Sequence, residues 1–460
     1  MTANQSITPL TYAINDQGHS CVGGVDLTEL AAAYGTPLYA LDAATFRAMA
    51  AAYHDALENH YPKDALALYA AKANLSMGLC KLADNLGLGL DVVSGGELYT
   101  AVQAGFPVEK VFFNGNNKSA DEIELALQYK VGRITVDNPD ELALIHEVAS
   151  RKGVRAEILL RISPGIECHT HDYIKTGQLD SKFGFHLGEL SAALDAITTQ
   201  YRDTMALKGL HAHIGSQIFE TRPYEDLVET MFNIYYNIRA SYGGLILPDL
   251  NLGGGLGVAY QSKDDPLNIE DAVATICQKA ARYAEKLDYP LPRLLLEPGR
   301  SMVATAGITL YTVGTRKTVP GVRKYVSVDG GMGDNIRPAL YQAEYSATLA
   351  NKAALPVDET VTIAGKYCES GDVLIRKLEI PTAEPGDVLA VFGTGAYNYS
   401  MASTYNRVPR PAMVLLENGA VHLLVRRETY DHLSALDVIP SYLMNPDPKP
   451  IPLAAQNRLE

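Results

Sequence analysis

Eight short apolar runs, separated by helical segments, recur through the first two-thirds of the chain. Each run has the length and the apolar character of a strand that is buried on both faces. They are Leu66–Ala71, Gly89–Val93, Val111–Asn114, Ile134–Asp137, Ala156–Ile162, Leu207–Ile214, Leu250–Leu252 and Leu294–Leu296. Buried strands that alternate with helices in this way predict a parallel, TIM-like (β/α)8 barrel over residues 45–305.

Capping residues mark where two of the intervening helices begin and end. Ser94 follows the second run at the head of a Ser-Gly-Gly-Glu capping-box pattern, and the helix predicted after it ends at Gly105. Asn138 and Pro139 follow the fourth run as an N-cap and a first helical residue, and that helix ends at Gly153. These signals support the alternation of strands and helices.

Beyond Gly307 the pattern changes to extended segments with turn signals between them, such as ITLYTVGTRKT, RKYVSVDGG, ETVTIAGKYC, GDVLAVFG and PAMVLLENGAVHLLVRRE. Asn418 and Gly419 predict a type I′ hairpin turn, because both residues tolerate positive φ angles. We therefore predict a mostly antiparallel β sandwich or barrel over residues 306–460, with a Pro-rich tail. The β-like segment TPLYALDAATF, within and just after residues 1–44, is expected to join this domain.

Composition excludes several classes of protein. The 460 residues suggest about two or three domains, and 47% apolar residues suffice for a full core, which excludes disorder as the main state. The net charge of −14 argues against nucleic acid and anionic membranes as partners. The sequence shows no signal peptide and no transmembrane run. We expect a soluble, cytoplasmic protein, since five cysteines lie too far apart for a disulfide framework: Cys21, Cys80, Cys168, Cys277 and Cys368.

The active site of such a barrel lies at the carboxyl ends of its strands. The chain carries a polar residue or a glycine at every predicted strand end, and a functional site is expected where these ends converge. In strand order these residues are Lys72, Asp91, Asn114, Asp137, Arg161, His213, Gly253–Gly255 and Glu297.

Lys72 lies in the segment YAAKAN at the end of the first strand. Burial among apolar residues would disfavour the ammonium form and leave an amine able to form a Schiff base. A lysine that reaches solvent along its own stem is the better interpretation for Lys72 taken alone. The polar groups at the other strand ends favour the Schiff base.

The loops after strands seven and eight have the features of a phosphate site, which TIM barrels often form there. Glycine N–H groups can bind an anion, although glycine clusters more often serve tight turns. The candidate phosphate-binding residues are Ser216, Gly253, Gly254, Gly255, Pro298, Gly299 and Arg300. An imine-forming lysine beside a phosphate site predicts pyridoxal 5′-phosphate (PLP) as the cofactor.

Two histidine pairs raise the question of a metal site. His211 and His213 share one face of the sixth strand, but no third ligand with matching spacing is evident, so no metal is predicted. Stacking of His213 on a flat cofactor ring is the simpler interpretation. The stretch Cys168-His169-Thr170-His171 raises the same question, and no metal is predicted there either. It belongs to the long insertion SPGIECHTHDYIKTGQLDSKFGF, which is typical of a lid or substrate loop.

Glu297 indicates the type of reaction. A carboxylate opposite the pyridine nitrogen would keep that nitrogen protonated and strengthen the ring as an electron sink, which decarboxylation requires. Racemases on a similar barrel are expected to place an arginine there. The alternative is that Glu297 only caps a helix at the barrel mouth.

Seven motifs, in order along the chain, resemble those of the diaminopimelate decarboxylases, a family of the fold-type III, alanine-racemase-like PLP enzymes. They extend from about residue 35 to about residue 440 and are YAAKAN, GLDVVSGGEL, HAHIGSQ, NLGGGLG, EPGRS, KYCESGD and FGTGAYNYSM. The segment HTHDYIKTGQLDSKFGF also resembles the lid of that family. The resemblance implies decarboxylation of meso-2,6-diaminopimelate to L-lysine and CO2, the last step of lysine biosynthesis.

The resemblance also implies roles for individual residues. Lys72 would form the Schiff base, His213 would stack on the cofactor ring, and Glu297 would face the pyridine nitrogen. The phosphate would be bound by Ser216, the run Gly253–Gly255, Gly299 and Arg300. The substrate carboxylates would be held by Arg300, Arg337 and Tyr341, while Tyr397 would contact both substrate and cofactor.

The last two residues implied by the resemblance lie in CESGD. Cys368 would return a proton to the substrate carbon and Glu369 would bind the distal ammonium, both from the neighbouring subunit of a homodimer. Without the family, Cys368 reads equally well as a buried strand cysteine, and Arg337 as a surface ion-pair partner. The alternative functions are a decarboxylase for ornithine, arginine or carboxynorspermidine, or a non-catalytic PLP carrier.

Overall fold

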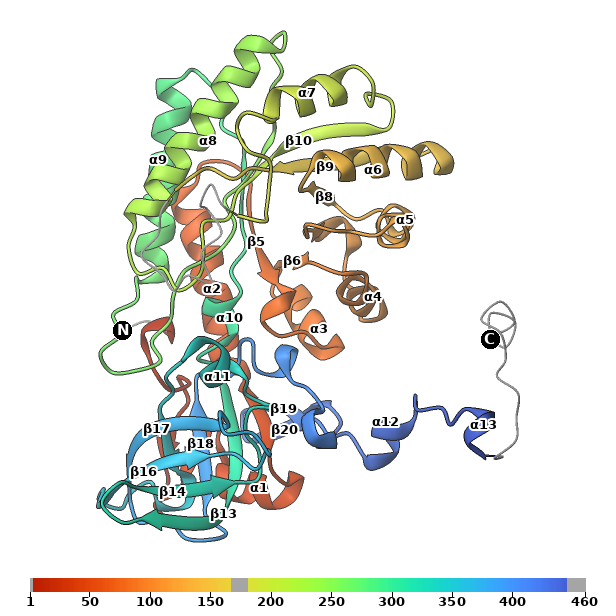
Figure 1. Cartoon of the computed structure of the whole chain (residues 1–460). Coiled ribbons are helices and arrows are strands. Elements are labelled where there is room, and N and C mark those ends of the chain that lie inside the picture. The colour runs from red at the N-terminus through yellow and green to blue at the C-terminus, as the bar shows by residue number, and fades with distance from the viewer. Residues whose placement is uncertain (1–2, 167–180, 445–460) are drawn as a thin grey trace.

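Eight parallel strands close into a barrel in a computed structural model that describes residues 3–166 and 181–444 (Figure 1). The strands are β5 (Ala65–Ala70), β6 (Gly89–Val92), β7 (Val111–Phe113), β8 (Arg133–Val136), β9 (Ala156–Arg161), β10 (Met205–His211), β11 (Asp249–Asn251) and β12 (Arg293–Leu296). The predicted (β/α)8 barrel is confirmed, and each predicted strand is present with shifted ends.

Helices surround this barrel. They are α2 (Ala43–His60), α3 (Met77–Asn85), α4 (Gly95–Gln103), α5 (Ala120–Tyr129), α6 (Pro139–Lys152), α7 (Leu190–Thr198), α8 (Arg222–Ser241), α9 (Ile269–Lys286) and the short α10 (Arg300–Val303). Ser94 caps α4 by accepting a hydrogen bond from Glu97 N, but the Glu97 carboxylate bonds to Val93 N, so the capping box is not closed. Asn138 caps α6, and Gly153 ends it with a φ of 64°.

Nine further strands form one sheet below the barrel (Figure 1). They are β4 (Leu38–Asp42), β13 (Gly307–Val319), β14 (Arg323–Val328), β15 (Ala347–Leu349), β16 (Glu359–Ala364), β17 (Val373–Ile380), β18 (Val388–Phe392), β19 (Ala412–Glu417) and β20 (Ala420–Val425). Most neighbours are antiparallel, as expected, but β14–β16 and β4–β19 are parallel pairs. The N-terminal β4 lies between β13 and β19.

The hairpin between β19 and β20 has the predicted turn. Asn418 and Gly419 have φ angles of 51° and 79°, and Glu417 pairs with Ala420. Two consecutive positive φ angles between antiparallel strands are those of a type I′ turn. The strands β15 and β17, in contrast, lie in segments where the sequence pattern predicts none.

Smaller elements complete the chain. Near the N-terminus, β1 (Ala13–Ile14), β2 (Ser20–Val22) and β3 (Val25–Asp26) form a separate sheet beside α1 (Leu27–Tyr34). In the β domain, α11 (Arg337–Tyr341) faces the barrel, whereas α12 (Tyr430–Ser434) and α13 (Ser441–Met444) extend away from the body (Figure 1). Within the described ranges, no helix has both the length and the apolar character needed to cross a membrane.

Candidate active site

A cavity of about 400 Å³ opens where the carboxyl ends of the barrel strands meet the β domain. This volume is within the range of small-molecule sites. Of the predicted strand-end residues, Asp137 and Gly253 do not line the cavity. Those that do are Lys72, Asp91, Asn114, Arg161, His213, Gly254, Gly255 and Glu297, and the β domain adds Arg337, Tyr341, Tyr397 and Met401.

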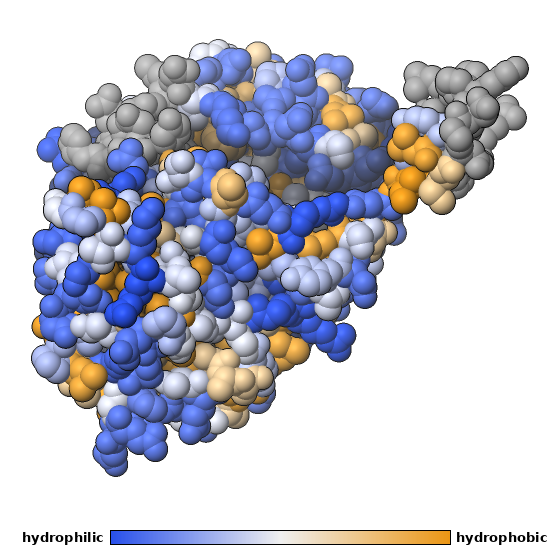
Figure 2. Space-filling view, turned by 60° about the horizontal axis from the view of Figure 1, so that its bottom comes forward, coloured by the Kyte–Doolittle hydropathy of each residue, from blue (hydrophilic) through white to orange (hydrophobic). Residues whose placement is uncertain are grey.

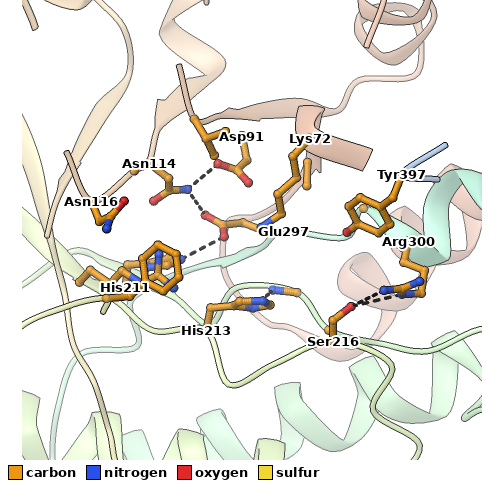
Figure 3. A pocket seen from close by; sticks show the side chains of 18 of the residues that line it. Lys72, Asp91, Asn114, Asn116, His211, His213, Ser216, Glu297, Arg300 and Tyr397 are labelled. Atoms are coloured by element: carbon orange, nitrogen blue, oxygen red, sulfur yellow. Dashed lines mark hydrogen bonds and ion pairs between the residues drawn. The ribbon is translucent and has the colours of Figure 1, made fainter. Parts of the chain in front are cut away.

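Lys72 reaches this cavity from a 3-10 turn, Ala71–Ala73, that follows β5. Its side chain is exposed, so the expectation that Lys72 is buried within an apolar strand is wrong. The carboxylates of Asp91 and Glu297 lie on the same side of the cavity as its amine (Figure 3). The turn therefore presents Lys72 to the cavity beside two acidic groups, and its availability as a nucleophile does not come from burial.

Glu297 follows β12 and is almost fully buried beneath the cavity. Its Oε1 accepts hydrogen bonds from Asn114 Nδ2 at 3.0 Å and Asn251 Nδ2 at 2.8 Å, while its Oε2 lies 3.0 Å from His211 Nε2. Burial raises the pKa of Glu297, but the interactions with His211 and Asn114 outweigh it and lower the pKa. Glu297 is therefore an oriented, ionised carboxylate.

The pKa of Asp91, at the end of β6, is shifted in the opposite direction from that of Glu297. Asn114 Nδ2 donates to Asp91 Oδ1 at 2.5 Å as well as to Glu297, and so it bridges the two acids (Figure 3). Burial and the negative charge of Glu297 raise the pKa of Asp91. Below about pH 7, the raised pKa of Asp91, the two neighbouring carboxyls thus differ in charge state, and Glu297 is the one that carries the negative charge.

His211 and His213 have different partners and do not act as a pair. The strand β10 ends at His211, which binds Glu297, whereas His213 follows the strand and lines the cavity. Burial, together with the charges of Lys72 and Arg161, lowers the pKa of His213 well below its ordinary value. Its neutral ring accepts a hydrogen bond from Gly254 N at 3.2 Å through Nδ1. Among the described residues, no cluster of three or more His, Cys, Asp or Glu side chains could hold a metal ion.

Ser216 and Arg300 form the opposite end of the cavity (Figure 3). The Arg300 guanidinium donates to Ser216 Oγ at 3.2 and 3.0 Å and to Tyr260 OH at 2.8 Å, and it is buried. Beside it, a Cβ on Gly254 would lie 2.1 Å from the Glu297 carbonyl oxygen, so only glycine fits there. A buried cation, a hydroxyl and a wall without side chains suit a bound anion.

Two predicted phosphate-binding residues lie outside the cavity wall. Gly253 N donates to Asn251 Oδ1 at 2.9 Å, and the Pro298 carbonyl accepts a bond from Ala70 N at 3.0 Å. Neither residue is among those that line the cavity. The structure thus gives Gly253 and Pro298 a part in the packing of the loops, and it brings Gly254, Gly255 and Gly299 to the wall.

Arg337 begins α11 and enters the cavity from the β domain. Its side chain is buried and donates to Tyr345 OH at 2.8 Å, and its guanidinium lies 5.5 Å from the ring centres of Tyr341 and Tyr397. The interpretation of Arg337 as a surface ion-pair partner is therefore wrong. Tyr397 has a φ of 63°, and its ring centre also lies 4.9 Å from the guanidinium carbon of Arg300.

Cys368 and Glu369 are not brought to this cavity. Both are exposed on the β domain, and the Cys368 N–H donates to Asn406 Oδ1 at 2.8 Å. The alternative of a buried strand cysteine is therefore wrong as well. Cys168 and His169, of the predicted lid, lie outside the described residues.

The sequence reasoning missed three residues of the site: His211 as the partner of Glu297, Asn251 and Tyr260. Asn251 is the last residue of β11 and sits in a fully buried position, where an amide needs a partner. A lone Asn in a buried strand that ends at the barrel mouth was the available signal. Tyr260 lies in a loop far from any strand end, and no pattern indicated it.

A carboxylate, an amine and an anion site around one cavity are the groups that a pyridoxal-binding barrel needs. The family described as "Pyridoxal-dependent decarboxylase, pyridoxal binding domain" matches residues 45–304. The chain is 50% identical to diaminopimelate decarboxylase of Bacillus subtilis, over 92% of this chain and 96% of that protein. It is also 50% identical to that of Bacillus methanolicus, over 93% and 98% of the two chains.

A solved structure gives the same result. The diaminopimelate decarboxylase of M. jannaschii in complex with L-lysine superposes with a TM-score of 0.87 at 37% identity, covering 96% of this chain and 100% of that one. The fold and the site thus define a PLP-dependent decarboxylase. Within that class, the chain belongs to the diaminopimelate decarboxylase family, which confirms the resemblance.

Proposed function

We propose that this protein decarboxylates meso-2,6-diaminopimelate to L-lysine and CO2. The buried guanidinium of Arg337 carries the proposal: its charge is surrounded by tyrosines, and no carboxylate of the described residues forms an ion pair with it. A buried cation requires an anionic partner, and a substrate with a second carboxylate supplies one. Ornithine and arginine have no such group, which disfavours the polyamine alternatives. The named relatives support the same substrate.

The residues of the cavity fit PLP. We propose that Lys72 would hold the reactive carbon of PLP, that His213 would lie against the PLP ring, and that Glu297 would face the ring nitrogen. Its phosphate would be bound by Ser216, Gly254, Gly255, Gly299 and Arg300. When bound, PLP supplies an electron sink for the pair left behind as CO2 departs.

The protein side chains would then act in order. Glu297, ionised and fixed by its donors, holds a proton at the ring nitrogen. Arg337 and Tyr341 orient the substrate by its distal carboxylate, so that the α-carboxylate is the one lost. Cys368 of a neighbouring subunit returns a proton to the α-carbon, and the amine of Lys72 displaces the product.

The site is proposed to be complete only in a homodimer. In a single chain, Cys368 is exposed and does not line the cavity. Its N–H donates to Asn406, and the neighbouring Arg407 donates to Leu433 and Asp437 of the arm that contains α12 and α13. Figure 2 shows hydrophobic side chains on this arm. The exposed apolar residues are Tyr430, Leu436, Val438, Ile439, Tyr442, Leu443 and Met444. An apolar arm beside the Cys368 loop supports a second copy as the partner.

We also propose that the chain divides into the barrel, residues 45–305, and a β domain formed by residues 1–44 and 306–460. The pairing of β4 with β13 and β19 supports this division. A cytoplasmic location is proposed from the widely spaced cysteines.

Product analysis tests the proposed function. The protein with PLP is incubated separately with meso-diaminopimelate, ornithine, arginine and carboxynorspermidine, and Lys72→Ala serves as the inactive control. We expect L-lysine from meso-diaminopimelate and no product from the others. A polyamine product would move the protein to a polyamine pathway, and no product from any substrate would favour the carrier alternative.

A further inference from the structure

The carboxylate of Asp372 joins two loops of the β domain. Asp372 is buried, with 4% of its surface exposed, just before β17. Its Oδ1 accepts a hydrogen bond from Met332 N at 2.7 Å, and its Oδ2 accepts one from Tyr367 N at 2.8 Å. Each oxygen therefore fixes the backbone of a different loop.

The two loops pack around this carboxylate without spare room. A Cβ on Gly331 would lie 2.4 Å from Asp372 Oδ1, and one on Gly365 would lie 2.1 Å from Oδ2. The loops are also joined directly, because Lys366 N donates to the Gly330 carbonyl oxygen at 2.9 Å. Burial raises the pKa of Asp372, so its two backbone donors are what stabilises the ionised form. Asp372 thus lies at the centre of the closely packed contact between the two loops.

One of these loops leads to the cavity of the same chain. Gly331 N donates to Asp334 Oδ2 at 2.9 Å, and the Gly331 carbonyl accepts a bond from Asn335 N at 2.8 Å. The helix α11 starts two residues later with Arg337, which lines the cavity. A shift at Met332 would therefore be passed on to the Arg337 guanidinium.

The other loop carries Cys368 and Glu369, which are exposed and do not line that cavity. Asp372 N donates to the Glu369 carbonyl oxygen at 3.1 Å, so the turn between them is closed by the same residue. Because Tyr367 directly precedes Cys368, the hydrogen bond from Tyr367 N to Asp372 fixes the position of the Cys368 thiol.

We propose that Asp372 is a positioning residue that holds Arg337 in the cavity of its own subunit and Cys368 and Glu369 for the cavity of its partner. This inference rests on the proposed function, in which Cys368 acts across a homodimer. Asp372 thereby contributes to both active sites of the dimer, although it lines neither.

A hybrid dimer separates the two effects. One subunit carries Lys72→Ala and the other carries Cys368→Ala, each with its own affinity tag, so that a single cavity keeps Lys72 from one chain and Cys368 from the other. Asp372→Asn is then placed in either subunit. In the Lys72→Ala subunit it should lower kcat roughly tenfold and also raise KM, because that chain supplies both Cys368 and Glu369. In the Cys368→Ala subunit it should raise KM for meso-diaminopimelate roughly tenfold, because that chain supplies Arg337.

Controls make the outcomes distinct. Asp387→Asn is a matched variant, since Asp387 is also a buried carboxylate of this domain that accepts a backbone N–H, from Glu384 at 2.7 Å. It should leave kcat and KM unchanged. Asp372→Ser, which keeps one acceptor, should shift the same parameters less, and it serves if Asp372→Asn does not fold.

The hybrid without a change at Asp372 tests the proposed function. If it has no activity while the wild-type dimer is active, the shared site fails, and the role of Asp372 fails with it. If it is active but Asp372→Asn has the same effect in both subunits, or none, the shared site stands and the role of Asp372 alone is overturned.

Discussion

His211 Nε2 and Glu297 Oε2 lie 3.0 Å apart beneath the cavity, and both side chains are buried. Since Asn114 and Asn251 bond to the other oxygen of Glu297, three neighbours fix its orientation. His211 Nδ1 has no hydrogen-bond partner within the described residues, so the polar contact of this ring is with Glu297. This arrangement keeps a negative charge on the side chain that we propose faces the ring nitrogen of PLP.

Glu297→Gln should keep the shape of the site and remove this charge. We expect kcat to fall by roughly 10²-fold, because an uncharged amide does not stabilise a protonated ring nitrogen. PLP binding, followed by its visible absorption, should change much less. The exposed Glu344→Gln serves as a control, and near-normal turnover of Glu297→Gln would remove Glu297 from the mechanism.

Much of this architecture could be predicted because periodicity and strand-end chemistry are local properties. The eight barrel strands are uninterrupted apolar runs, and a residue such as Glu297 after such a run must lie at the barrel mouth. What failed were properties that depend on the exact strand end. Lys72 lies two residues beyond β5, in a turn, so its exposure could not be predicted from the pattern. His213, two residues beyond β10, lines the cavity as expected.

Long-range contacts were equally out of reach. Tyr260 bonds to Arg300 and Asp372 bonds to Met332 across 40 residues in each case. Nothing in the local sequence around either residue encodes such a partner. The exposure of Cys368 depends on the surface of the folded chain and was likewise not predictable.

Arg337→Ala tests the selection of the distal carboxylate. A charge-assisted hydrogen bond contributes about 1.5–3 kcal/mol, so KM for meso-diaminopimelate should rise by roughly 10- to 100-fold. Any weak activity on ornithine should not fall, because ornithine has no distal carboxylate. Steady-state kinetics with both substrates provide the measurement, with the exposed Arg323→Ala as the control. An equal loss on both substrates would exclude this role.

Asp334 gives the stability of the protein a specific pH dependence. Burial raises the pKa of Asp334 from its ordinary 3.8 to about 7, although Tyr311 and Gly331 N donate to its carboxylate. Between about pH 4 and 7 the folded state therefore binds more protons than the unfolded chain, and stability falls as pH rises. Asp334→Asn should flatten this decline in urea-unfolding experiments.

Asp387→Asn is the control for that experiment, because the pKa of Asp387 is shifted in the opposite direction. Burial raises the pKa of Asp387, but Lys352 and Asn351 outweigh it and lower the pKa below 3.8. Its contribution is therefore present above that pH and is lost as pH falls further. The same slope for Asp334→Asn and wild type between pH 4 and 7 would contradict the assignment.

Lys118 and Glu141 form a buried ion pair that joins the loop between β7 and α5 to α6. Lys118 Nζ lies 2.6 Å from Glu141 Oε1 and also donates to the Thr135 carbonyl oxygen at 2.7 Å. Lys118→Met leaves a buried carboxylate without its partner and should lower the free energy of unfolding by about 3–5 kcal/mol. Replacing both residues with apolar ones should recover part of this loss.

The exposed pair of Lys263 and Glu344 provides the comparison. Lys263→Met should change stability by only about 0–1 kcal/mol, because water screens that pair. Equal effects of the two lysine variants in urea unfolding would show that the burial of Lys118 has no energetic consequence.

The yield of L-lysine and CO2 from meso-diaminopimelate, measured in one reaction, tests the proposed activity most directly. With purified protein and PLP, we expect equal amounts of both products, matching the substrate consumed, and neither product from Lys72→Ala. Substrate consumption without lysine, or lysine formation that persists in Lys72→Ala, would contradict decarboxylation at this cavity.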